Sequence, residues 1–193
     1  MKTSLKLIGA LLVTLSIGLS SREAHALGPV GIEVGLRVGD GTNPSGNNSG
    51  VNPFGVGLGG RAGITLFNIY AGVDIMDYLG SGDTYGGIYH AMQYGGTVGY
   101  GIKISVLTIR PQIGLGNISL SGSNNPADYP SSSTFYLEPG ALAMITIGWL
   151  YFGADINALF ITTEPAYGSG GNVNTNTNWP ISVAIDGQLG VTF

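Results

Sequence analysis

The stretch ISVAIDGQLGVTF, residues 181–193, alternates apolar residues with small or polar ones up to its last position. Successive side chains of a strand point to opposite faces, so a period of two predicts a strand with one apolar face. The same alternation occurs in GPVGIEVGLRVG (28–39) and in FGVGLGGRAGITL (54–66). In the second of these the apolar phase begins at Phe54 and continues through Val56 and Leu58.

Extending this pattern along the chain predicts about eight strands, at 29–39, 54–66, 69–79, 88–104, 108–120, 135–147, 151–163 and 180–193. Most of them are longer than the 5–6 residues usual in soluble sheets, and they reach the roughly 9–11 residues that a tilted strand needs to cross a bilayer. Short links at 67–68, 105–107 and 148–150 alternate with long, polar, turn-rich links at 40–53, 80–87, 121–134 and 164–179. This alternation is typical of a bacterial outer-membrane barrel. The predicted fold is therefore all-β, an eight-stranded antiparallel up-and-down transmembrane β-barrel.

The first 26 residues have the features of a secretory signal peptide. A basic segment, MKTSLK, precedes the apolar run LIGALLVTLSIGLS and the small-x-small sequence AHA at 24–26. An uncleaved membrane anchor is the alternative, but the apolar run is short for a span of about 20 residues. We expect cleavage after Ala26, with Ala24 and Ala26 forming the recognition site, and a barrel domain over 27–193.

The composition excludes several classes of protein. The chain has 7 basic and 11 acidic residues, of which Lys2, Lys6, Arg22 and Glu23 precede the cleavage site, leaving 4 against 10 and a net charge of −6. An acidic chain without a basic patch is a poor candidate for binding nucleic acid. The absence of cysteine excludes disulfides and thiolate metal sites, and no cofactor is expected. Charged residues make up only 9% of the chain, far below the usual quarter of a soluble domain.

Charged residues within the predicted strands share one phase, opposite the apolar set. A charge facing lipid costs roughly 2–4 kcal/mol at the bilayer midplane, so this phase must face the barrel interior. Catalytic, pore-lining and structural roles are all open to such charges. We favour a structural ion-pair network because breaking a buried pair costs about 3–5 kcal/mol. The predicted network consists of Glu33, Arg37, Arg61, Asp74, Lys103, Arg110, Glu138, Asp155 and Asp186.

Aromatic residues and two prolines give further expectations. Aromatic residues gather near the short links, where an interfacial girdle is expected, and this set is Phe67, Tyr70, Trp149, Tyr151, Phe152 and Phe193. Pro111 and Pro139 lie inside predicted strands of a sheet that has no edge. We interpret each proline as a bulge or local kink.

These features together resemble the small eight-stranded outer-membrane barrels of the OmpA/OmpX/OmpW-like class. The resemblance covers residues 27–193 and implies residence in the outer membrane of a Gram-negative bacterium, in contact with its lipid and lipopolysaccharide. It also implies that the C-terminal strand is the signal read by the barrel assembly machinery. Here that signal maps onto Ile185, Leu189, Val191 and Phe193, with Gly187 departing from the usual bulkier residue.

Motifs that would indicate an enzyme or a metal site are weak. Some barrels of this class modify lipid A with His, Ser and an acid, and His90 with Ser81 and Asp83 is the nearest candidate set. The predicted phase of His90 is outward, so we expect no catalytic site. GVGLGG (55–60) lacks the helix that a dinucleotide fingerprint requires. The remaining acidic residues have no Ca²⁺-loop spacing, and they are Asp40, Asp77, Asp83, Asp128 and Glu164.

The sequence therefore predicts a non-enzymatic outer-membrane barrel with an ion-paired interior. Its long external loops would serve surface interaction or envelope integrity, with a surface ligand that the sequence does not name. The alternative is a narrow channel or porin for small or hydrophobic solutes. A lipid A-modifying enzyme is the third hypothesis.

Overall fold

The computed structural model describes residues 30–42, 51–82, 88–122, 132–162 and 181–193. Nearly all of these residues are in strands of a single sheet. The strands are β1 (Val30–Gly41), β2 (Val51–Leu66), β3 (Ile69–Gly82), β4 (Ile88–Tyr100), β5 (Ile102–Ile104), β6 (Leu107–Gly122), β7 (Ser132–Ile147), β8 (Leu150–Ile161) and β9 (Ile181–Thr192).

The sheet closes on itself to form a barrel. Its strand order is β4-β3-β2-β1-β9-β8-β7-β6-β5, and pairing of β4 with β6 completes the ring. All pairings are antiparallel. Strand β5 continues β4 beyond Gly101 and keeps the register that β4 has on β6, so the two form one wall strand. The predicted eight-stranded antiparallel barrel is confirmed.

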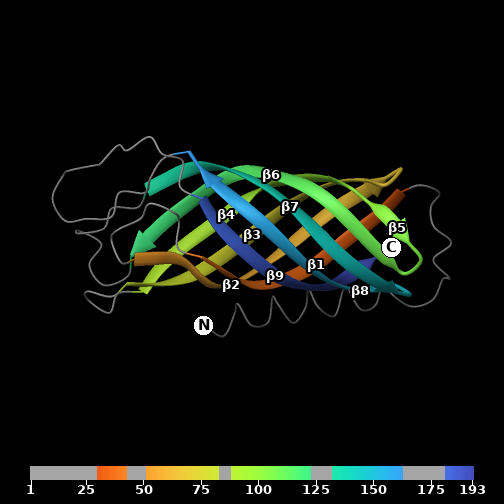
Figure 1. The fold of residues 1–193 in the computed structure, drawn as a ribbon, viewed down its shortest axis with the longest axis horizontal. Helices are drawn as coiled ribbons and strands as arrows, with labels where there is room; N and C mark the ends of the chain where they lie inside the picture. Colours follow the sequence, from red (N-terminus) through yellow and green to blue (C-terminus); the bar gives the residue numbers. More distant parts are fainter. Residues whose placement is uncertain (1–29, 43–50, 83–87, 123–131, 163–180) are drawn as a thin grey trace, which may run out of the picture.

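The two ends of the barrel differ in their connections (Figure 1). The turns after β2, β5 and β7 lie together at one end, which we call the short-turn end. The turn after β2 consists of Phe67 and Asn68, both with positive φ (49° and 69°). Two residues of positive φ match the right-handed twist of a hairpin, and this explains how a link of two residues joins such long strands.

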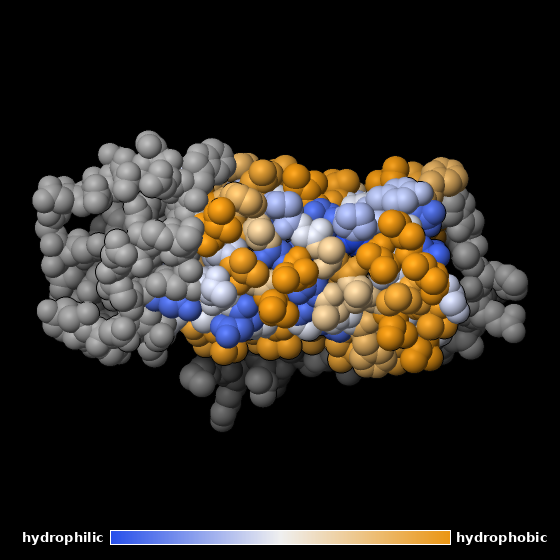
Figure 2. Space-filling view, viewed as in Figure 1, coloured by the Kyte–Doolittle hydropathy of each residue, from blue (hydrophilic) through white to orange (hydrophobic). Residues whose placement is uncertain are grey.

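Many large apolar side chains cover the outer surface of the barrel, with polar residues between them, as Figure 2 shows for one face. Large hydrophobic side chains point outward along every strand, while most charged side chains of the strands point inward. This arrangement inverts that of a water-soluble protein and matches a surface that faces lipid. Among the described residues there is no helix long and apolar enough to cross a membrane. Examples of the outward set are Leu36, Val38, Leu58, Val73, Val98, Ile156 and Ile185.

A bulge in β2 corrects one predicted phase. The register of β2 on β3 shifts by two residues between Asn52 and Val56, so the segment between them, which contains Phe54, leaves the regular ladder. Phe54, expected on the lipid side, is therefore buried inside the barrel. From Val56 onward the predicted phase holds.

Of the bulge or local kink predicted at each proline, the bulge does not occur between β6 and β7. The register of β6 on β7 runs unbroken through both Pro111 and Pro139. Each proline instead lies at a gap in the pairing on the other side of its strand. The pairing of β6 with β4 and β5 is interrupted opposite Pro111, and the pairing of β7 with β8 is interrupted at Pro139. The missing N–H of proline thus interrupts one ladder without shifting the register.

The predicted aromatic girdle is wrong at two positions. Phe67, Trp149, Phe152 and Phe193 are exposed at the short-turn end, but Tyr70 and Tyr151 are fully buried in the interior. Proximity to the short links suggested a girdle for these two tyrosines, whereas their phase in the strands places them inside. Tyr151 lies over Gly35 and Gly190, where the ring occupies the space that a Cβ would need.

Candidate functional site

Eight of the nine charged residues predicted for the interior are buried there. Glu33, Arg37, Arg61, Asp74, Arg110, Glu138, Asp155 and Asp186 are all buried, and we call this set the ionic layer. Lys103, the ninth predicted member, is exposed on β5 at the short-turn end. Its side chain lines the open end of the lumen, and no ion pair joins it to another described residue.

Arg37 is the centre of the ionic layer. Its Nη2 lies 2.7 Å from Asp186 Oδ2, 3.4 Å from Asp155 Oδ2 and 4.0 Å from Glu138 Oε1. Its Nη1 lies 3.9 Å from Asp74 Oδ1. These carboxylates come from β3, β7, β8 and β9, so one guanidinium on β1 draws together side chains from across the lumen. We call Arg37 and its four carboxylates the Arg37 cluster.

A second ion pair lies nearer the short-turn end. Both terminal nitrogens of Arg110 donate to the Glu33 carboxylate, with Nη1 2.9 Å from Oε2. Two-point pairing of this kind is the strongest geometry that arginine offers a carboxylate. The Tyr70 ring contacts two guanidiniums, with Arg110 Cζ 4.3 Å and Arg61 Cζ 4.6 Å from its centroid. Glu33 and Tyr70 together hold Arg61 and Arg110 in the lumen.

Amides and hydroxyls complete the layer, and the sequence reasoning did not single them out. Gln188 Nε2 donates to Asp155 Oδ2 at 2.7 Å, and its Oε1 accepts from Arg61 at 3.3 Å. Thr97 Oγ1 donates to Asp74 at 2.9 Å, and Gln93 donates to Glu138. All these residues are on the inward phase of their strands, so the alternation could have identified them. Their partners depend on which strands face one another across the lumen.

Apolar side chains fill the interior at the other end. Inward residues from six strands pack into one cluster, which we call the apolar plug: Phe54, Met76, Tyr78, Ala91, Ile118, Tyr136, Leu159 and Ile161. Phe54 and Tyr78 meet edge to face, with ring centroids 5.5 Å apart. The sequence reasoning missed this cluster. Its signal was the loss of polar inward residues toward the long-link ends of β3, β6 and β8.

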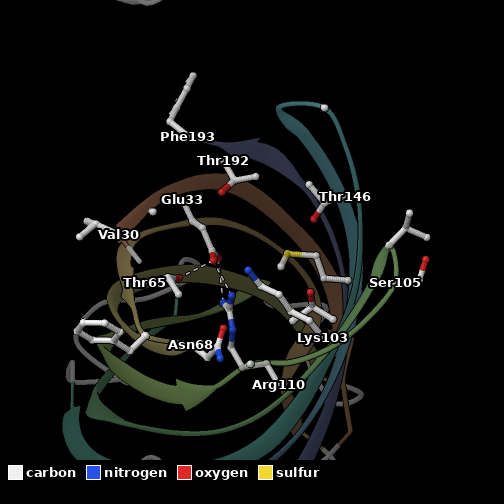
Figure 3. Close-up of a pocket in the computed structure, with 17 residues that line it drawn as sticks. Val30, Glu33, Thr65, Asn68, Lys103, Ser105, Arg110, Thr146, Thr192 and Phe193 are labelled. Atoms are coloured by element: carbon white, nitrogen blue, oxygen red, sulfur yellow. Dashed lines mark hydrogen bonds and ion pairs between the residues drawn. The ribbon is translucent and has the colours of Figure 1, made fainter. Parts of the chain in front are cut away.

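The interior is open to solvent at the short-turn end. A cavity of about 660 Å³ begins at the rim, where Phe67, Val106 and Phe193 line it, and ends against the Glu33–Arg110 pair. We call it the mouth cavity. Figure 3 shows Lys103 extending from the wall into this space, below Thr146 and beside Glu33 and Arg110. The interior thus has three successive parts: an open mouth, an ionic layer and an apolar plug.

Of the candidate catalytic set, only the His90 side chain lies within the described residues. His90 is half-exposed on the outward phase of β4, and its Nδ1 lies 3.6 Å from Asp77 Oδ1. The side chain of Ser81 and the whole of Asp83 lie outside the described residues, as do Asp128 and Glu164. Within the described ranges, no group of three or more His, Cys, Asp or Glu residues could hold a metal ion.

Residues predicted to carry the assembly signal lie on β9 or directly follow it. Ile185, Leu189 and Phe193 are exposed on the outer surface, and Val191 is half-buried. The backbone of Phe193 exchanges two hydrogen bonds of 2.9 Å with Ile32, so this strand pairs with β1 up to its last residue. Ala24 and Ala26, the predicted cleavage site, lie outside the described residues.

Comparisons with known proteins support the fold. No protein-family model and no curated protein sequence matches the chain. Among solved structures, Neisserial surface protein A (NspA) aligns with a TM-score of 0.58 at 11% identity, covering 86% of this chain and 97% of that one. The N-terminal β-barrel domain of OprF from Pseudomonas aeruginosa aligns with a TM-score of 0.49 at 11% identity, covering 83% and 97%. A major outer membrane protein from Thermus thermophilus aligns with a TM-score of 0.49 at 15% identity, covering 85% and 98%. The chain therefore has the fold of the small outer-membrane barrel NspA.

Proposed function

We propose that this protein is a non-enzymatic barrel of the bacterial outer membrane. On this proposal, its interior is a structural core and its long links act at the cell surface, in surface interaction or envelope integrity. The apolar outer face supports residence in a membrane, and the similarity in fold to NspA supports the outer membrane. Export would require removal of residues 1–26 by cleavage after Ala26. Barrel assembly would use the outward residues of β9 as its signal. Lipid and lipopolysaccharide would contact the outer face.

The single observation that carries the proposal is the filled interior. The ionic layer places each arginine against carboxylates, an amide or an aromatic ring, and the apolar plug packs eight residues beyond it. An eight-stranded barrel has room for little more than its own side chains. A core of this kind favours stability of the barrel over conduction.

Planar-bilayer recording tests this interpretation. We expect the purified protein to be silent at all voltages. The triple variant Arg37→Ala/Tyr78→Ala/Tyr136→Ala should conduct, because it removes the central guanidinium of the ionic layer and two rings of the plug. Lys103→Met, which changes only the mouth cavity, is the matched control and should stay silent. Discrete conductance steps in the wild type would contradict the proposal.

The role of the long links needs a separate experiment. Replacing residues 123–131 and 163–180 by two-residue Asn-Gly turns should leave a barrel that still folds, since such turns suit hairpins. The folded band on an unheated gel checks this. We expect the variant to fail to restore envelope resistance to detergents in a deletion strain. Full restoration by the shortened barrel would contradict a role for the links.

A narrow channel is the second candidate, and the mouth cavity favours it. The cavity reaches from the rim to the Glu33–Arg110 pair, so that solvent enters the lumen from one end. Rearrangement of the ionic layer and the plug would be needed to complete a path. If the wild type conducts and the Glu33→Gln variant has a different conductance, the channel function is supported over the structural one.

Absence of enzymatic activity is part of the proposal. A hydroxyl nucleophile needs a base within hydrogen-bonding reach, and the contact that the structure gives His90 is with Asp77. Mass spectrometry of lipid A from cells with and without the protein tests this point. A mass change that disappears in His90→Gln would identify an enzyme.

A further inference from the structure

The ionic layer contains more negative than positive groups. Among the described interior residues there are five carboxylates, Glu33, Asp74, Glu138, Asp155 and Asp186, and three guanidiniums, Arg37, Arg61 and Arg110. Arg110 is matched by Glu33, and the four other carboxylates share Arg37. Buried charges are very unfavourable unless they are compensated, so this surplus requires a further positive charge or neutralisation.

Two carboxylates of the surplus, those of Asp155 and Asp186, belong to neighbouring strands. These residues are directly opposite each other in the pairing of β8 with β9, and their exposed fractions are 2% and 0%. Both direct one oxygen at the same Nη2 of Arg37. The other oxygen of each, Oδ1, is buried and has no hydrogen-bond partner among the described residues. Like charges directly opposite on neighbouring strands are destabilising, and two orphaned oxygens increase the cost.

The two carboxyl groups converge, since their Oδ2 atoms lie 3.4 Å and 2.7 Å from the same Nη2 of Arg37. An ionised carboxylate only accepts hydrogen bonds, whereas a protonated one also donates. Contact between two carboxyl groups therefore becomes favourable when one of them carries a proton. We propose that Asp155 and Asp186 bind one proton between them, which makes this pair a protonation site in the wall of the barrel.

The surroundings favour a proton over a metal ion. Arg37 on β1 already places a full positive charge against both carboxyls, and the described residues contain no group of three or more ligands for a metal. Other groups facing the pair are neutral donors or further acids. They are Asp74 and Tyr78 on β3, Gln112 on β6, Glu138 on β7, Asn157 on β8 and Gln188 on β9.

Loss of this proton would leave two adjacent negative charges sharing one guanidinium. The folded barrel would then become less stable as the pH rises, because the folded state binds a proton that the unfolded chain does not. One proton limits the effect to about a tenfold change in the unfolding equilibrium per pH unit. Replacing either acid by its amide supplies a permanent donor and should remove this dependence.

Infrared spectroscopy of the refolded barrel in lipid vesicles tests the proposal directly. We expect a protonated-carboxyl C=O band at neutral pH that shifts in D₂O, disappears in Asp186→Asn and persists in Glu138→Gln, the matched control from the same cluster. Absence of the band from the wild type would overturn the proposal, even if no variant folds. A band that disappears in Glu138→Gln and persists in Asp186→Asn would also overturn it.

Urea unfolding from about pH 5 to about pH 9 supplies the second readout. The unfolding equilibrium of the wild type should shift toward the unfolded state as the pH rises, and that of Asp186→Asn should shift less. Identical pH slopes would contradict the site. Binding of an alkali-metal ion in place of the proton is the alternative, and repeating the titration with choline in place of sodium at equal ionic strength tests it. Stability that depends on sodium would indicate such an ion and would overturn the proposed protonation site.

Discussion

The two halves of the barrel interior are built from different chemistry. Toward the short-turn end the ionic layer joins strands through charges, amides and one aromatic ring, beside a small apolar cluster of Leu142, Met144 and Tyr151. Toward the other end the larger apolar plug joins them through packing. Both halves fill the same ring of eight strands. The difference teaches that the interior of a narrow barrel can be filled either by paired charges or by apolar packing. Each half should therefore respond differently to the loss of a charge, the creation of a cavity or a change in salt.

Removal of Arg37 is expected to have the largest effect on stability. Arg37→Met would leave four buried carboxylates without their common cation, and breaking a buried pair costs about 3–5 kcal/mol. Equilibrium unfolding in urea, followed by tryptophan fluorescence, measures the loss. A loss below about 1 kcal/mol would show that the charges are well solvated in the lumen, and the contrast between the halves would disappear.

A cavity in the apolar plug should cost nearly as much. Leu159→Ala removes a buried side chain from packed surroundings, and such changes cost about 2–5 kcal/mol. The same urea titration applies. Because no charge is involved, the loss should be independent of salt, and equal salt sensitivity of this variant and Arg37→Met would contradict the division into two halves.

An intermediate effect is expected at the amide that bridges two parts of the ionic layer. Gln188→Leu removes the donor to Asp155 and the acceptor of Arg61, leaving both groups under-satisfied at a cost of about 1–3 kcal/mol. Gln188→Glu is the informative companion, because it keeps the acceptor and adds a negative charge. If both variants unfold like the wild type, the amide is not part of the network.

The smallest effect is expected at the rim. Lys103 is exposed and no described residue forms an ion pair with it, so Lys103→Met should change stability by less than about 0.5 kcal/mol. A larger loss, measured in the same way, would show that the ionic layer extends into the mouth cavity.

The alternation of the sequence was sufficient to predict the barrel and the inward phase of its charges. Lipid imposes this regularity, because a charge on the outer face is costly across the hydrocarbon core. The pattern fails where the backbone departs from a regular ladder, as at Phe54 within the bulge in β2. It also fails where position along the chain was used in place of phase, as for Tyr70 and Tyr151.

The pairing of charges could not be predicted in the same way. Arg37 lies on β1 and its carboxylates lie on β3, β7, β8 and β9, so their meeting depends on the stagger of strands around the ring. Periodicity within one strand contains no information on that stagger. The plug was missed for a related reason, since apolar inward residues from separate strands form a cluster only after the ring has closed.

Closure of the ring gives the contact between Arg37 and Asp186 a kinetic role. This contact joins β1 to β9 and spans 149 residues, whereas most other neighbouring strands are successive in the chain. Ordering such a long segment is entropically costly, so this junction should form late in assembly. The Arg37–Asp186 pair therefore stabilises only the completed ring and contributes nothing to the hairpins that form early. It must break before β1 and β9 can separate. Weakening it should accelerate opening more than it slows folding.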